Sequence, residues 1–259
     1  MGVINITPDS FSDGGRFLDP ALAYAQAERL IAAGADIIDI GGESTRPGAA
    51  PVSEAEELAR ITPVLARLRN LPVPISVDTR RVAVMRAAIE GGAAMINDIE
   101  ALQSPGALSL LAQGDCAVCL MHMQGQPGTM QTAPHYVDVV REVAAFLAAR
   151  VAAAQAAGIA RDRIVVDPGF GFGKTAAHNL ALLRALGEFS SLGTAVLAGL
   201  SRKSMLGAIT GRAVGERAAS SVSAALIAVQ RGAHIVRVHD VAATRDALTV
   251  WQAVLGEVE

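Results

Sequence analysis

Eight short apolar runs recur along this 259-residue chain, and Ala- and Leu-rich stretches with helical spacing separate them. Nearly every run ends in a polar or charged side chain. The runs are residues 3–5, 37–40, 75–78, 95–98, 118–122, 164–167, 196–201 and 235–239. Strand alternating with helix eight times is the pattern of a (β/α)8 TIM barrel of the α/β class. In that fold the active site lies at the carboxyl ends of the strands, so the pattern predicts both the fold and the position of the site.

Length and composition favour one barrel domain that covers residues 1–259. About 250 residues are typical of such a barrel. Aromatic residues make up only 3% of a chain that is 51% apolar, so aliphatic side chains must fill the core. A net charge of -3 argues against a nucleic-acid or anionic-membrane partner. Two cysteines imply no disulfide framework and favour the reducing cytoplasm.

Helices are expected between the strands, and their ends carry recognisable signals. The expected ranges are 19–33, 53–68, 81–90, 104–113, 135–157, 177–186, 203 or later to 231, and 244–254. Ser53 followed by Glu56 matches a capping box. Gly34, Gly91 and Gly158 stand where helix C-caps belong. The most hydrophobic long stretch, 139–160, contains three charged residues and is therefore interpreted as a barrel helix and not a membrane span.

Two loops after the first and second strands, residues 7–16 and 41–51, are long and rich in Gly, Ser, Asp and Pro. Ordinary solvated connections would have the same composition. We expect mobile lids instead, because both loops lie at the end of the barrel that carries the polar strand termini.

An anion site is predicted where strands seven and eight end. Strand seven runs into Ser201, Arg202, Lys203 and Ser204 and then into a helical pattern, whose free N–H groups attract anions. Arg237 and His239 are two residues apart and share one face of strand eight. The alternative is that Arg237 and His239 form an ion pair with Asp240 or a structural cap. We favour anion binding because barrels often hold phosphate at this corner.

Carboxylates and an amide form a second predicted cluster. Asp78 and Asp167 end strands three and six, and Asn97 lies at the end of strand four. In a barrel these ends face one cavity, which suits a flat heterocycle rich in N–H donors, because a carboxylate accepts two parallel hydrogen bonds. For Asp39 and Asp98 we favour a structural role instead, as a helix cap or in a pair with a lysine.

Other suggestive residues are interpreted as structural. Cys116 and Cys119 have metal-site spacing, but residues three apart on a strand face opposite sides, so buried thiols are expected. His122 is interpreted as a cavity wall or a satisfied core histidine. Residues 167–175 resemble a phosphate-binding P-loop, yet the first glycine of that motif would fall at Pro168.

Several segments resemble one known family. Residues 1–15, MGVINITPDSFSDGG, and residues 39–48, DIGGESTRPG, resemble the two signature loops of dihydropteroate synthase. Residues 76–79, 96–98, 121–123, 167–174, 201–204 and 237–240 match too, in order along the whole chain. The resemblance implies a transferase that joins p-aminobenzoate to 6-hydroxymethyl-7,8-dihydropterin diphosphate. The products would be 7,8-dihydropteroate and diphosphate, in folate biosynthesis.

The resemblance also implies a role for each matching residue. Asn5 would bind Mg²⁺, and Ser204 would meet the carboxylate of p-aminobenzoate. The diphosphate would be held by Arg237, His239, Thr45 and Arg46. The pterin slot would be lined by Asp78, Asn97, Asp167 and Lys203, with Met121 and Phe172 as apolar walls. The closing loops would carry Phe11, Asp13, Thr45 and Arg46, and the catalytic groups would be Asp78, Lys203, Arg237 and His239. A homodimer through the helices near the last strands is implied as well.

Two alternative functions would fit parts of the pattern. A pterin-binding methyltransferase of the methyltetrahydrofolate–corrinoid type would share the pterin pocket, but it would need neither the diphosphate corner nor the loop at 7–15. A non-catalytic pterin-binding paralogue would have lost site residues, and none of the matching positions is lost.

The start of the chain departs from the family pattern. Members usually carry a short segment before the first strand that covers the bottom of the barrel, whereas this chain opens on that strand at Met1. We therefore expect an internal start or a trimmed chain, and a higher melting temperature for an extended version.

Overall fold

The computed structural model describes residues 1–6, 19–44 and 52–256, which contain eight parallel strands in consecutive order. The strands are β1 (Gly2–Asn5), β2 (Ile38–Gly41), β3 (Ile75–Asp78), β4 (Met95–Asp98), β5 (Ala117–Met121), β6 (Ile164–Asp167), β7 (Ala195–Ala198) and β8 (Ile235–Val236). The ring closes where Val3 N donates to Val238 O at 3.2 Å and Val238 N donates to Met1 O at 2.9 Å. The predicted (β/α)8 barrel is confirmed.

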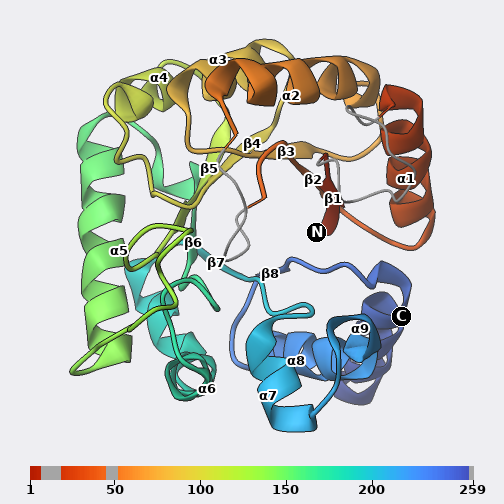
Figure 1. The fold of residues 1–259 in the computed structure, drawn as a ribbon, viewed down its shortest axis with the longest axis vertical. Helices are drawn as coiled ribbons and strands as arrows, with labels where there is room; N and C mark the ends of the chain where they lie inside the picture. Colours follow the sequence, from red (N-terminus) through yellow and green to blue (C-terminus); the bar gives the residue numbers. More distant parts are fainter. Residues whose placement is uncertain (7–18, 45–51, 257–259) are drawn as a thin grey trace.

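Nine α-helices of the described residues form an outer ring around these strands (Figure 1). They are α1 (Pro20–Ala32), α2 (Glu54–Leu68), α3 (Val82–Glu90), α4 (Ala107–Ala112), α5 (Val139–Ala156), α6 (Ala176–Arg184), α7 (Ser204–Thr210), α8 (Ala218–Gln230) and α9 (Val241–Leu255). Short 3₁₀ turns η2 (Arg161–Arg163), η3 (Leu186–Leu192) and η4 (Val214–Glu216) join some of them. None of these helices has the length and apolarity that a bilayer crossing requires.

Successive side chains of each strand point alternately out of and into the barrel, so the apolar residues form two separate cores. Outward-facing residues such as Ile40 and Val77 pack under the helices in the larger cluster. Inward-facing residues Met95, Cys119 and Leu197 belong to a smaller cluster that fills the barrel interior. This apolar filling makes the interior a packed floor, so that polar groups gather above it at the carboxyl ends of the strands.

The helix expected from about residue 203 to 231 is wrong as a single element. Gly211, at φ +70°, ends α7, and η4 separates it from α8. A left-handed backbone stops a helix and is favourable for glycine, which has no Cβ. The expected strand 235–239 is also shorter, because the regular pairing of β8 ends at Val236.

Helix ends agree in part with the sequence signals. Ser53 Oγ accepts a hydrogen bond from Glu56 N at 3.2 Å, as the capping box requires. The carboxylate of Glu56 instead binds Arg60, at 2.5 Å. At the end of α3, Gly91 is the C-cap, but the left-handed residue is the next one, Gly92, at φ +92°.

Candidate active site

Arg237 forms the charged centre of the carboxyl edge, directly after β8. Its Nε donates to Asp39 Oδ2 at 2.7 Å, and its Nη2 lies 2.6 Å from the same oxygen and 3.1 Å from Asp78 Oδ2. Asp39 has no exposed surface, whereas the Asp78 side chain is 14% exposed. Burial raises the pKa of Asp78 to about 7, although the neighbouring Arg237 opposes the rise.

The structural role expected for Asp39 is therefore confirmed, but its partner is Arg237 and not a lysine. The alternative pairing of Arg237 with Asp240 is wrong, because Asp240 accepts two bonds from Arg202 instead, at 2.6 and 3.1 Å. Asp98 also has the expected structural role. It accepts from Glu100 N at 2.8 Å and Leu102 N at 2.7 Å and so shapes the turn after β4.

Asp167 and Lys203 form a second charged group, at the ends of β6 and β7. Asp167 is 5% exposed and accepts from Gly169 N at 2.7 Å. Lys203 donates to Phe170 O, and its Nζ stands 4.5 Å from the centre of the Phe172 ring. Burial raises the pKa of Asp167 and lowers that of Lys203 to about 8.

Gly199 links this group to Arg237. A Cβ built on Gly199 would lie 3.9 Å from both Asp167 Oδ2 and Lys203 Nζ, and 4.0 Å from Arg237 Cβ. The two charged groups thus border one space, and the glycine leaves that space open. Sequence reasoning did not single out Gly199. The sequence does offer a signal for this residue, because Gly199 comes two residues after the inward-facing Leu197 and so falls on the same face of β7.

The remaining predicted residues of the described chain lie on the same edge. Asn97 pairs in register with Asp78 across β3 and β4, and Met121 ends β5; both are buried. His239 Nδ1 lies 3.0 Å from the Ser201 hydroxyl, which also accepts from the His239 N–H. Ser204 is exposed and begins α7.

Four predicted residues lie outside the described residues. They are Phe11, Asp13, Thr45 and Arg46. The two expected lids, residues 7–16 and most of 41–51, also lie outside the described residues. The described stems of the second loop are joined, however, because Arg81 binds both the Glu43 carboxylate and the Val52 carbonyl oxygen.

Asn5, the predicted Mg²⁺ ligand, ends β1 on the same edge. Its register partner is Gly41, and Gly41 pairs in turn with Asp78. Since Gly41 has no side chain, space remains between Asn5 and the carboxylates. No group of three or more His, Cys, Asp or Glu able to hold a metal occurs among the described residues. Mg²⁺ often takes only one or two protein oxygens and completes its shell with water and phosphate, so the amide oxygen of Asn5 fits this ion.

Residues excluded from chemistry are buried as expected. Cys119 lies in the barrel interior and Cys116 in the outer cluster, and burial raises the pKa of both thiols. His122 is a satisfied core histidine, with Nδ1 2.9 Å from Lys174 Nζ. Lys174 is only 3% exposed, and this burial was not predicted from the sequence.

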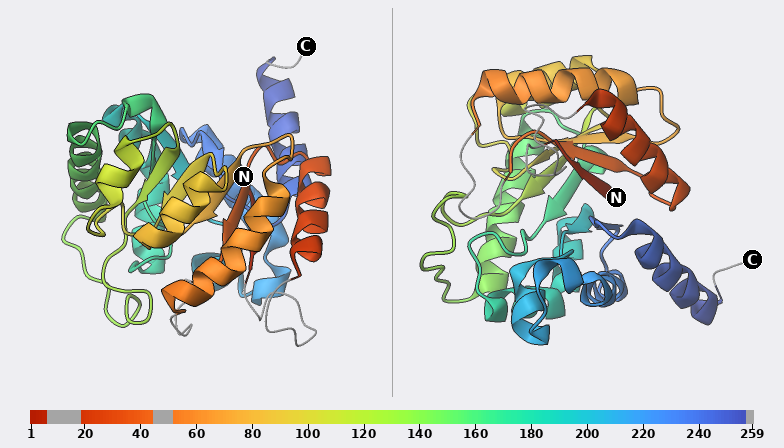
Figure 2. Two further views of the ribbon diagram at one scale, coloured as in Figure 1. Left: turned by 90° about the horizontal axis from the view of Figure 1, so that it is seen from above. Right: turned by 45° about the vertical axis from the view of Figure 1, so that its right-hand side comes forward.

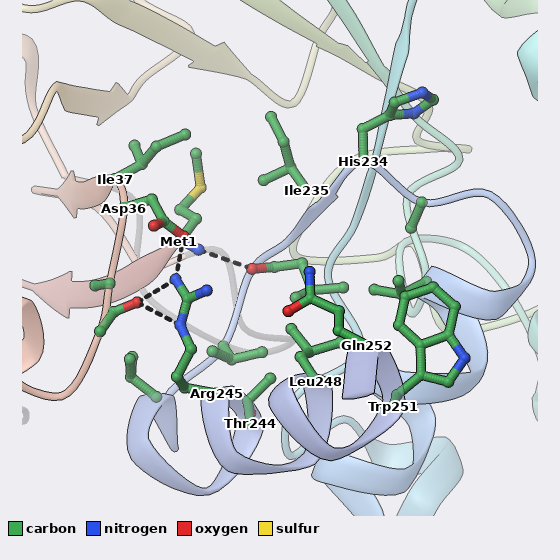
Figure 3. A pocket seen from close by; sticks show the side chains of 17 residues that line it. Met1, Asp36, Ile37, His234, Ile235, Thr244, Arg245, Leu248, Trp251 and Gln252 are labelled. Carbon is green, nitrogen blue, oxygen red and sulfur yellow. Dashed lines mark hydrogen bonds and ion pairs between the residues drawn. The ribbon is translucent and has the colours of Figure 1, made fainter. Parts of the chain in front are cut away.

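A cavity of about 280 Å³ lies at the opposite, amino-terminal end of the strands (Figure 3). Met1, Asp36, His234, Arg245 and Trp251 are among its lining residues. Arg245 binds Asp36 at 2.5 Å, so these two charges at the cavity are already paired. The end of α9 projects beyond the barrel near this cavity (Figure 2). None of the predicted site residues lines it.

Fold and site together define a barrel enzyme whose carboxyl edge can hold a flat, N–H-rich ring beside an anionic group. The family model described as pterin binding enzyme matches residues 1–239. A dihydropteroate synthase from Neisseria meningitidis serogroup B is 57% identical over 98% of this chain and 91% of its own length. The chain therefore belongs to the dihydropteroate synthase family.

Solved structures agree with this assignment. A Xanthomonas albilineans dihydropteroate synthase with 4-aminobenzoic acid has a TM-score of 0.93 and is 55% identical, over 98% of this chain and 92% of that one. A Burkholderia cenocepacia enzyme complexed with 7,8-dihydropteroate has a TM-score of 0.88 and is 53% identical, over 98% and 90% of the two chains. The family and the transferase class suggested by the sequence are confirmed.

Proposed function

We propose that this protein condenses 6-hydroxymethyl-7,8-dihydropterin diphosphate with p-aminobenzoate, giving 7,8-dihydropteroate and diphosphate for folate biosynthesis. The observation that carries the proposal is the shared space between two charged groups, Arg237 with Asp78 and Lys203 with Asp167. Carboxylates recognise the N–H groups of a pterin, and the cations attract its diphosphate. Relatives that bind 4-aminobenzoic acid and 7,8-dihydropteroate favour this reaction over methyl transfer or binding alone.

The reaction needs a good leaving group more than it needs a base, because the amine of p-aminobenzoate is already nucleophilic. We infer that the C–O bond to diphosphate breaks first and leaves a resonance-stabilised pterin cation. Arg237 and His239 would stabilise the charge that develops on the departing diphosphate. Asp78 would stabilise the cation, and attack by the amine would then form the C–N bond and release one proton.

Positioning of the ring follows from the walls of the site. Asp167 and Asn97 would bind the edge of the pterin, while Met121 and Phe172 would pack against its faces. Ser204, at the start of α7, would bind the p-aminobenzoate carboxylate. Thr45 and Arg46 would contact the diphosphate, and the loop that carries Phe11 and Asp13 would exclude water.

Mg²⁺ would be held by the amide oxygen of Asn5 together with diphosphate oxygens. When bound there, the ion would neutralise charge on the leaving group. We expect EDTA to abolish turnover and added Mg²⁺ to restore it.

The test is diphosphate release by the purified protein, with Mg²⁺, dihydropterin diphosphate and p-aminobenzoate each omitted in turn. Release that requires all three, with dihydropteroate as the product, is the expected result. Pterin binding without release would instead identify a non-catalytic paralogue. Absence of both would contradict the proposal.

We also propose a cytoplasmic homodimer. The segment from α7 to α8 carries three exposed apolar side chains, Ile209, Val214 and Ile227, and such residues are common at subunit interfaces. The two buried thiols suit a reducing compartment. Sedimentation equilibrium should give twice the chain mass, and an Ile227→Glu variant should shift the protein toward the monomer.

A further inference from the structure

The segment that joins β6 to α6 is held by side chains to an unusual degree. Each of its five consecutive carbonyl oxygens, from Gly169 to Gly173, accepts a hydrogen bond from a side chain. The donors are Lys174 for residues 169 and 172, Lys203 for 170, Gln131 for 171 and Tyr136 for 173. This segment also carries Phe172, one wall of the pterin slot.

Lys174 is the donor at the centre of this arrangement. Its Nζ lies 2.9 Å from Gly169 O, 3.0 Å from Phe172 O and 2.9 Å from His122 Nδ1. Burial lowers the pKa of His122 to about 3, so the ring is neutral and Nδ1 accepts the third bond. Burial lowers the pKa of Lys174 to about 7. In the protonated form, its three donor positions are all directed at groups of the protein. Lys174 therefore acts on the fold of the segment and not directly on a substrate.

Close backbone packing also restricts the β6–α6 segment. Gly169, at φ +70°, lies so close to β5 that an added Cβ would overlap His122 O at 1.9 Å. Gly173, at φ +61°, would similarly overlap Gln124 O at 2.3 Å. The backbone is therefore pressed against the end of β5, and the ammonium of Lys174 ties it to His122 on that strand's exit. The hydrogen bonds of Lys174 set where Phe172 stands.

We propose that Lys174 is a positioning residue for the reaction. It fixes the β6–α6 segment so that Phe172 and the Phe170 carbonyl hold the Lys203 ammonium beside Asp167. This inference rests on the proposed function, since it assigns a purpose to the wall of the proposed pterin slot. It also explains a buried lysine, whose pKa burial lowers to about 7, that has no carboxylate within hydrogen-bonding distance among the described residues.

The test compares Lys174→Met with Arg163→Met. Methionine keeps the length of the side chain and removes every donor. Arg163 is a matched control because its guanidinium also binds carbonyl oxygens, those of Leu111 and Cys116, at the other end of β6. We would measure the melting temperature, the Kd of dihydropterin diphosphate with Mg²⁺, and both KM values well below the melting temperature.

We expect both variants to melt lower. Only Lys174→Met should bind dihydropterin diphosphate about tenfold to a hundredfold more weakly, with a matching fall in kcat/KM. Lys174→Arg, which keeps a cation with donors, should recover part of the lost affinity. A Lys174→Met protein with wild-type pterin affinity and kcat/KM would overturn the proposal, because its role would then be structural alone.

If Lys174→Met does not fold, Tyr136→Phe replaces it in the comparison. This change removes only the bond to Gly173 O and should weaken pterin binding about two- to fivefold; unchanged affinity would overturn the proposal. Failure of the proposed function is separate, because the wild-type protein itself would then neither bind dihydropterin diphosphate nor release diphosphate.

Discussion

Arg237 Nη2 lies 2.6 Å from Oδ2 of Asp39, a carboxylate that is completely buried. The same nitrogen is 3.1 Å from Asp78, so one cation faces two carboxylates. When both carboxylates are ionised, this group of three carries a net negative charge. Asp39 is nearer to the cation and closed to solvent, whereas Asp78 borders the slot. The uncompensated charge is therefore directed where a pterin cation would form.

Asp78→Asn should lower turnover about tenfold to over a hundredfold, because one charged interaction with the transition state contributes roughly 1.5–3 kcal/mol. The amide keeps the shape and a hydrogen-bonding oxygen but loses the charge. The measurement is kcat for diphosphate release at pH 8, where the wild-type carboxylate is mostly ionised. Turnover within threefold of wild type would remove Asp78 from its electrostatic role.

The effect of the same substitution on stability should be more favourable at alkaline pH than at acidic pH. The folded pKa of Asp78, about 7, is above its ordinary value of 3.8, so the folded state binds this proton more tightly than the unfolded chain. The contribution of Asp78 to the unfolding free energy therefore falls as pH rises through that window, by at most about 1.4 kcal/mol per pH unit. Asparagine has no such proton. The melting temperature of the variant minus that of wild type should be larger at pH 8 than at pH 5, and an equal difference would contradict this account.

Asp39→Asn should destabilise the folded protein. Breaking a buried ion pair costs roughly 3–5 kcal/mol, and here somewhat less because Arg237 retains Asp78. The free energy of unfolding in urea would show the loss at pH 8. KM for dihydropterin diphosphate should rise too, since Arg237 would lose the contact that orients it. A variant as stable as wild type would mean that Asp39 does not hold Arg237.

The strand pattern predicted the barrel and its carboxyl edge because each strand has the same design. Asp78 and Asp167 each stand at the end of a different buried run, and parallel strands bring such ends together. The sequence therefore predicted which described residues share an edge. It predicted the structural roles of Asp39 and Asp98 as well, without identifying the partner of Asp39.

Other features depend on contacts between residues distant in sequence. The pairing of Arg237 with Asp39 spans 198 positions, and no local pattern shows it. Lys174 was missed for a similar reason, because a lysine next to a glycine-rich loop is normally solvated and only the folded loop encloses it. The division between α7 and α8 was missed because apolar residues on both sides of Gly211 continue a helical pattern.

Gly171→Ala should weaken pterin binding by moving Lys203. Gly171 has φ +78°, and an added Cβ would lie 3.0 Å from Lys203 Cδ. Left-handed backbone costs roughly 1–2 kcal/mol for a residue other than glycine, so stability should fall as well. Gly114→Ala is the control, since its Cβ would meet nothing within 4 Å. Equal Kd values of the two variants for dihydropterin diphosphate would contradict the close approach of Gly171 to Lys203.

The charge of Lys203 should govern the alkaline side of the pH profile. Burial lowers the pKa of its ammonium to about 8 in the substrate-free protein, and kcat/KM reports groups in that state. Above this pH the side chain becomes neutral, so its attraction for the anionic diphosphate is lost and kcat/KM for dihydropterin diphosphate should fall. Lys203→Arg keeps the charge at every accessible pH and should remove the fall, at a lower overall activity because a guanidinium does not match the site beside Phe170 and Phe172. The measurement is kcat/KM at a series of pH values on either side of pH 8. A flat wild-type profile, or the same fall in Lys203→Arg, would show that another group controls substrate capture.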